Sequence, residues 1–166
     1  MTDHLKIIQN VTNEHNALKG NIKLVGDTVT DHEATTTLQK LRSGWIPGQL
    51  DVLDTRLDNL KQALSRLKKG LDSHFAFEEK TFPPLLGDML TKALLMEHTQ
   101  IMKEMDSSQK LLSEVNFNGL SREEIIAKEM EIQQVISRLA AIVESHHEKE
   151  ETVMELIRKA LQQKDT

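Results

Sequence analysis

The chain has 166 residues, of which 28% are charged and 38% hydrophobic, with a formal net charge of −5. This length allows one domain with a continuous core, so we expect a single domain over residues 1–166. The absence of cysteine excludes disulfides, thiol catalysis and thiolate metal sites. The acidic balance argues against a nucleic-acid partner, and no apolar run approaches the ~18 residues of a membrane span. We therefore expect a cytoplasmic protein with no membrane partner.

The composition favours helices along the whole chain. Leu, Lys, Glu, Gln, Ala and Met dominate, and alternating strand patterns are missing. The first helix is expected to begin near Thr2 and to continue to about Leu41, although Gly20 and Gly26 weaken its second half. Trp45 is expected to anchor the connection that follows against the rest of the domain.

Three further helices are bounded by turn and cap residues. The second lies between Pro47–Gly48 and Pro83–Pro84, and the third between Gly87 and about Val115. The fourth begins after Ser121, which forms a capping-box pattern with Glu124. Apolar residues step by three and four on these helices, most clearly at Leu57, Leu60, Leu64, Leu67 and Leu71, and at Ile132, Ile136, Leu139 and Val143. Long amphipathic helices with short connections predict an all-α, antiparallel up-down four-helix bundle.

Polar residues interrupt each apolar stripe. A histidine falls on the stripe of every helix, and on two helices a glutamate follows one turn later, on the same face. The residues are His15, His74 with Glu78, His98, and His146 with Glu150.

These histidines are expected at similar heights in the bundle. His74 and His98 each lie about 12–15 Å from the connection between their helices, at a rise of roughly 1.5 Å per residue. If the first helix runs long, His15 and His74 lie 28 and 26 residues from the connection between their helices. His146 fits the same level more loosely.

Such a layer would be costly to bury without cations. An unpaired ionised carboxylate inside an apolar bundle costs several kcal/mol, and divalent ions offset that cost. A nitrogen and oxygen ligand set without sulfur suits iron or manganese, and zinc less distinctively. The alternative is that the histidines are hydrogen-bonded core residues without a metal. His4 and His32 lie far along the first helix from His15 and are expected at the surface or the terminus.

The motifs together resemble the hemerythrin-like, or HHE cation-binding, domain family over about Asp3 to Leu161. The pattern repeats within the chain. Glu14-His15 is similar to Glu97-His98, and the two His-x-x-x-Glu-Glu motifs are similar to each other. The pattern comprises His15, His74-Phe-Ala-Phe-Glu78-Glu79, Glu97-His98 and His146-His147-Glu148-Lys149-Glu150-Glu151.

The resemblance implies a centre of two iron ions of the Fe–O–Fe type, with manganese or zinc possible. By that resemblance, Glu78 and Glu150 bridge the ions, and the imidazole ligands are His15, His74, His98 and His146. Oxygen-carrying members have a further histidine where this chain has Met102, which argues against reversible oxygen carriage. His147 and Glu151 have the spacing of His146 and Glu150, so they could supplement or replace them. Glu14, Glu79 and Glu97 are weaker candidates, expected to orient ligands.

Three functions stay open at this point. The first is a di-iron protein that binds or senses a small molecule (O2, NO or peroxide) or iron. The second is a redox enzyme on the same site that consumes peroxide or oxidises ferrous iron, although the chain has no tyrosine for radical relay. The third is a non-catalytic helical interaction module. No catalytic residue is assigned, and either a monomer or a homodimer is compatible with the sequence.

Overall fold

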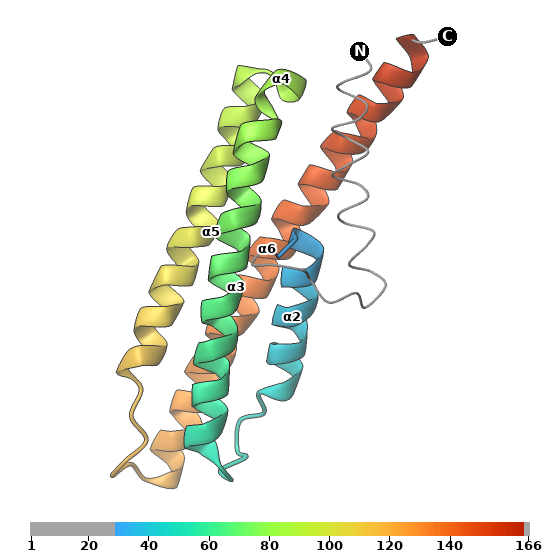
Figure 1. Cartoon of the computed structure of the whole chain (residues 1–166). Coiled ribbons are helices and arrows are strands. Elements are labelled where there is room, and N and C mark those ends of the chain that lie inside the picture. Colours follow the sequence, from blue (N-terminus) through green and yellow to red (C-terminus); the bar gives the residue numbers. More distant parts are fainter. Residues whose placement is uncertain (1–28, 165–166) are drawn as a thin grey trace.

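A computed structural model describes residues 29–164 of the chain, and all regular structure in that part is helical. This confirms the predicted all-α class. The described helices are α2 (Asp31–Gly44), α3 (Leu53–Thr81), α4 (Pro83–Leu86), α5 (Asp88–Glu114) and α6 (Arg122–Lys164). In Figure 1, α3 and α6 rise from the lower end of the molecule, while α2 and α5 descend. None of the helices within this part of the chain is long and apolar enough to cross a membrane.

The described part has five helices because a single turn, α4, separates α3 from α5. Pro83 and Pro84 occupy the first turn of α4, where the missing proline N–H would be unsatisfied anyway. Gly87 then takes a positive φ of 77° before α5 begins. The predicted ends of the second and third helices therefore hold to within a few residues. The predicted capping box also forms at the start of α6, where Ser121 Oγ accepts a hydrogen bond from the Glu124 N–H at 3.2 Å.

The expectation of one continuous helix from Thr2 to Leu41 is wrong at Thr30. This residue is extended, with φ −78° and ψ 165°, and its hydroxyl accepts a hydrogen bond from the Glu33 N–H at 3.4 Å. A residue in that conformation caps a helix instead of continuing one. The helix that leads to Leu41 therefore begins at Asp31, and the remainder of the predicted element lies outside the described residues.

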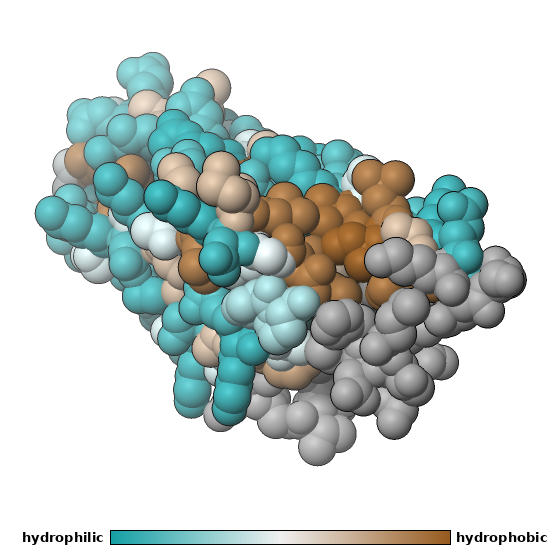
Figure 2. Space-filling model, turned by 90° about the horizontal axis from the view of Figure 1, so that it is seen from above, coloured by the Kyte–Doolittle hydropathy of each residue, from teal (hydrophilic) through white to brown (hydrophobic). Residues whose placement is uncertain are grey.

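The apolar stripes of the long helices meet in two clusters. The main cluster contains the buried leucines of α3, together with residues of α2, α5 and α6 up to Val143. A smaller cluster of Phe82, Leu94 and Met154 lies toward the end of the molecule that carries α4. Apolar side chains gather in the view from above this end (Figure 2). The buried polar residues between the two clusters along α3, α5 and α6 form part of the site described below.

A clamp of four residues fixes the connection between α2 and α3 onto α6. The indole N–H of Trp45 donates to the Glu129 carbonyl at 2.9 Å, which confirms the anchoring role predicted for this residue. The Glu129 carboxylate is fully buried and accepts from the Gly48 N–H at 3.3 Å. Arg56 lies 3.9 Å from the same carboxylate and stacks over the Trp45 ring.

We expect Glu129→Ala to lower the free energy of unfolding by about 1–3 kcal/mol, because it leaves the Gly48 N–H and the half-buried Arg56 guanidinium without their acceptor. Chemical denaturation measures the change. Glu131→Ala, on the exposed face of the same helix, is the control and should alter stability by less than about 0.5 kcal/mol. Equal effects of the two substitutions would contradict the role of the clamp.

Gly70 allows the chain before α2 to approach α3 closely. The Val29 N–H donates to the Gly70 carbonyl at 3.2 Å, and a Cβ at position 70 would overlap the Val29 side chain. Val29 lies two residues before Asp31. The absence of a side chain at Gly70 therefore fixes where the first turn of α2 lies against α3.

Candidate metal centre

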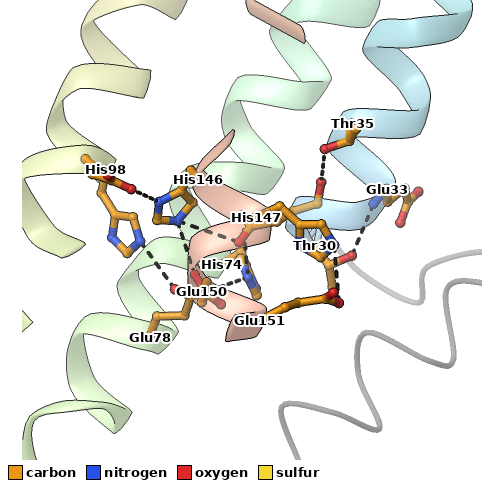
Figure 3. Close-up of polar contacts among 12 residues, drawn as sticks. Thr30, Glu33, Thr35, His74, Glu78, His98, His146, His147, Glu150 and Glu151 are labelled. Carbon is orange, nitrogen blue, oxygen red and sulfur yellow. Dashed lines mark hydrogen bonds and ion pairs between the residues drawn. The ribbon is translucent and has the colours of Figure 1, made fainter. Parts of the chain in front are cut away.

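Six buried polar residues from four helices form a layer between the two apolar clusters. Their relative exposures lie between 0% and 3%. Figure 3 shows the imidazoles and carboxylates turned toward one another. The residues are Asp31 of α2, His74 and Glu78 of α3, His98 of α5, and His146 and Glu150 of α6.

Two overlapping sets of ligand atoms converge within this layer. One set comprises Glu78, His98, His146 and Glu150, and the other comprises Asp31, His74, Glu78 and Glu150. In each set, one atom from every residue lies within 4.8 Å of the others. Glu78 and Glu150 belong to both sets. This is the arrangement required of two carboxylates that each serve two neighbouring ions.

Three imidazoles contact the two shared carboxylates, Glu78 and Glu150. His98 Nε2 lies 3.3 Å from Glu78 Oε2, and His146 Nε2 lies 3.1 Å from Glu150 Oε2. His74 Nε2 contacts Glu78 Oε1 one helical turn away. The α-helix produces the two His–Glu pairs directly, because residues four apart share a face.

Asp31 supplies a third carboxylate from the first turn of α2. Its Oδ1 lies 3.9 Å from His74 Nε2, and its Oδ2 lies 3.7 Å from His146 Nε2. Both distances exceed a hydrogen bond but leave room for an ion to lie between carboxylate and imidazole. Asp31 therefore faces imidazoles from two different helices.

Phe75 lies against two of the imidazoles. Its ring stacks on His98 with centroids 3.9 Å apart and an interplanar angle of 7°, and it meets His146 edge-on at 5.7 Å. A surface groove of about 480 Å³ between α3 and α5 reaches this pair and is also lined by Met102 and Glu79. The groove brings solvent to the outer edge of His98.

The carboxylate oxygens of the layer lack regular hydrogen bonds within the described part of the chain. Both oxygens of Asp31, Glu78 and Glu150 are buried without such a partner, as are Nε2 of His98 and of His146. Buried acceptors normally have a donor, and a buried charge is normally paired or bound to a metal. Three carboxylates and two imidazoles in this state fit a cation site of nitrogen and oxygen ligands.

Burial and crowding shift the pKa values of the layer. Burial, and next the nearby charge of Glu150, raise the pKa of Asp31 from 3.8 to about 7. Burial and the charge of Glu78 raise the pKa of Glu150 from 4.5 to about 7. Burial alone would lower the pKa of His146, but Glu150 and Asp31 outweigh it and raise that pKa to about 9. Burial would raise the pKa of Glu78, but its close contacts with the His74 and His98 imidazoles outweigh burial and lower that pKa. The layer therefore attracts positive charge, as protons or as metal ions.

Two outer carboxylates hold the far nitrogens of the imidazoles. Glu97 Oε1 lies 2.9 Å from His146 Nδ1, and its other oxygen accepts from Lys149 Nζ at 2.8 Å. Glu79 Oε1 lies 3.4 Å from His98 Nδ1. A carboxylate on one ring nitrogen fixes the orientation of the ring and leaves the other nitrogen directed into the centre. Glu79 and Glu97 occupy the orienting positions expected from the sequence.

The structure brings together five of the six residues selected from the sequence and adds one. His15 lies outside the described residues, so its role as a ligand stays a prediction. Its predicted height required one helix that continued to about Ser43, whereas α2 begins at Asp31 after the extended Thr30. Asp31 was missed, although Thr30 and Glu33 have the spacing of a capping box that marks a helix start.

The doubled motif of α6 separates into two pairs. His146 and Glu150 lie in the buried layer, whereas His147 pairs with Glu151 at 3.3 Å and belongs to neither converging set. His32, which was expected at the surface, is half-buried, and its ring centroid lies 5.8 Å from that of His147. Its distance from His15 lies outside the described residues.

Comparison with known proteins supports the same kind of site. Residues 6–128 match the family model described as the hemerythrin HHE cation binding domain. The match includes Asp31, His74, Glu78 and His98, and it ends before His146 and Glu150 of α6. Searches of the curated proteins and of the solved structures returned no significant match. With well over half of its length covered by the family model, the chain belongs to the hemerythrin HHE cation-binding domain family.

Proposed function

We propose that the chain is a non-haem di-iron protein that binds or senses a small molecule (O2, NO or peroxide) or iron. The observation that carries this proposal is the buried layer in which Glu78 and Glu150 each belong to both converging sets of ligand atoms. Two shared carboxylates favour a pair of neighbouring ions over a single ion. The long helices α2, α3, α5 and α6 are the antiparallel up-down bundle that holds the layer.

The charge of the layer suits two divalent ions. Asp31, Glu78 and Glu150 supply three negative charges, and neutral imidazoles supply nitrogen donors. Six protein ligands leave open positions on two ions, where iron supplies the binding of oxygen species and one-electron chemistry. In this arrangement His74 would hold one ion, and His98 and His146 would hold the other. The sequence-based prediction that His15 adds a fourth imidazole belongs to the same proposal.

The residues around the layer control access and ring orientation. Glu97 and Glu79 hold the rings of His146 and His98 from outside. Phe75 stacks on the face of His98. Met102 lines the groove, and its side chain has no nitrogen that could bind a metal ion. These features favour a small ligand over a bulky substrate.

Metal analysis after anaerobic loading with ferrous iron tests the proposal. We expect about two irons per chain, and an absorption band in the near ultraviolet after exposure to oxygen. Protein that takes up no iron would contradict the proposal and leave a helical interaction module. Stopped-flow mixing with peroxide separates binding from catalysis, because multiple turnovers would identify a redox enzyme.

We expect Glu97→Gln to weaken iron binding by about 10–100-fold, because the His146 ring loses the charged acceptor that orients it. Competition with a chelator measures the affinity. Glu144→Gln, on the exposed face of α6, is the matched control and should leave the affinity unchanged. An unchanged affinity in Glu97→Gln would show that packing alone orients His146.

A further inference from the structure

Lys149 of α6 forms an ion pair that leads directly to a residue of the buried layer. Its Nζ donates to Glu97 Oε2 at 2.8 Å. The other oxygen of that carboxylate, Oε1, lies 2.9 Å from His146 Nδ1. His146 Nε2 in turn lies 3.1 Å from Glu150 Oε2 within the layer. One carboxylate of α5 therefore joins a lysine at the surface to an imidazole of the proposed centre.

The helix places both partners of Glu97 on one flank of α6. His146 and Lys149 are three residues apart, and residues at this spacing are neighbours on a helix surface. Glu97 reaches them from α5, and each of its oxygens has a separate partner. The exposed fraction of the side chain falls from 62% for Lys149 to 30% for Glu97 and 2% for His146. The series therefore runs from solvent into the layer.

The contact with His146 gives this ion pair a consequence beyond holding α5 to α6. An ion pair at the surface contributes little to stability by itself. A hydrogen-bond partner at the outer nitrogen of a ligand imidazole, however, tunes the metal that the ring binds. Glu97 lies closer to its imidazole than Glu79, which is 43% exposed and lies 3.4 Å from His98 Nδ1. The Glu97 carboxylate is therefore the better placed of the two to act on a ligand.

Lys149 and Glu97 act on the His146 ring in opposite directions. A carboxylate at Nδ1 attracts the ring proton and makes the imidazole a stronger electron donor at Nε2. A lysine on the other carboxylate oxygen draws negative charge away from Nδ1, because hydrogen bonds in series polarise one another. A stronger donor stabilises ferric iron more than ferrous iron. Glu97 therefore favours the ferric state, and Lys149 moderates that preference.

We propose that Lys149 is a positioning residue that sets, through Glu97, the electron donation of His146 to the iron it binds. This role rests on the proposed di-iron function and adds a residue that determines the reduction potential of the centre. Lys149 binds no metal itself. Its ammonium group fixes where the Glu97 carboxylate lies and how much negative charge faces Nδ1.

Redox titration of the iron-loaded protein, followed by its near-ultraviolet absorption, tests the proposal. Lys149→Met should lower the midpoint potential, so that the ratio of ferric to ferrous iron at a fixed potential rises roughly two- to fivefold, as expected for one exposed ion pair. Glu97→Gln, measured with excess iron, should raise the potential, because it removes the negative charge at Nδ1. Lys149→Arg keeps the charge and the donor and should restore the wild-type potential.

Lys159→Met is the matched control. Lys159 is also an exposed lysine of α6, and its Nζ lies 3.8 Å from Glu155, a carboxylate outside the layer. Its substitution should leave the potential unchanged. Equal potentials in wild type and Lys149→Met, or shifts of the same sign in Lys149→Met and Glu97→Gln, would overturn the role of Lys149. Failure of the di-iron function would appear differently, as missing iron in the wild-type chain, and would remove this role with it.

Discussion

Glu78→Ala should reduce the iron content of the protein at least tenfold. Glu78 is fully buried, contacts His74 and lies 3.3 Å from His98, and it belongs to both converging sets of ligand atoms. Its removal therefore takes a ligand from both proposed ions at once. Loss of an orienting group beside a metal ligand already costs about 10–100-fold in affinity, and loss of a shared ligand costs at least as much.

A second substitution separates the lost charge from the lost volume. Glu78→Gln keeps the shape of the side chain but removes its charge, and we expect nearly the same loss of iron. Glu148→Ala, on the exposed face of α6, is the control and should retain about two irons per chain. Metal analysis and the near-ultraviolet spectrum measure both effects. Full iron content in either Glu78 variant would contradict the shared-carboxylate centre.

The metal-free protein should lose stability as pH rises from about 4 to about 9. The pKa of Asp31 rises from 3.8 to about 7, and that of Glu150 from 4.5 to about 7, so the folded state holds more protons than the unfolded state in this window. The pKa of His146 rises from 6.5 to about 9 and extends the effect upward. Stability falls with pH wherever the folded state binds more protons. Each unit of pKa shift is worth about 1.4 kcal/mol, so the total loss is several kcal/mol.

Opposite shifts limit the effect on the acid side. The pKa values of Glu78 and Glu97 are lowered, so their contribution to stability is lost as pH falls below about 4.5. The greatest stability of the metal-free protein is therefore expected at mildly acidic pH. Bound metal replaces the protons of the layer, so the iron-loaded protein should be destabilised by acid instead.

Asp31→Asn isolates one part of this pH dependence. It removes a buried carboxyl with a raised pKa, so the metal-free variant should be more stable than wild type at pH 8. The same substitution removes a proposed ligand and should weaken iron binding. Asp58→Asn, at an exposed position of α3, is the control. Thermal unfolding between pH 4 and 9, with and without iron, measures these effects, and a flat profile for the metal-free wild type would rule out the mechanism.

The sequence predicts α3 and its site residues well because one pattern covers both. The leucine stripe continues without a break in register into His74 and Glu78, so the face that packs the core also fixes the direction of these side chains. The apolar stripe of α6 likewise predicts the direction of His146 and Glu150. Capping and proline signals set the helix ends, and these signals act over only a few residues.

The α2 side of the site could not be predicted from the same kind of pattern. Asp31 is an aspartate in a polar first turn, and nothing in its periodicity distinguishes it from a solvent-exposed residue. Its burial depends on Gly70, which lets the chain pass close to α3, and on the cap at Thr30. These are contacts between segments distant in sequence, so they are visible only once α2 is placed against α3 and α6.

The clamp at the α2–α3 connection has a practical consequence for experiments. Trp45 is the single tryptophan of the chain, is 4% exposed, and contacts Glu129. Glu129 lies 17 positions before His146 on α6, about 25 Å along the helix. At that separation a bound metal cannot quench the indole by contact. Tryptophan fluorescence of the metal-free protein should therefore report the opening of the α2–α3 connection.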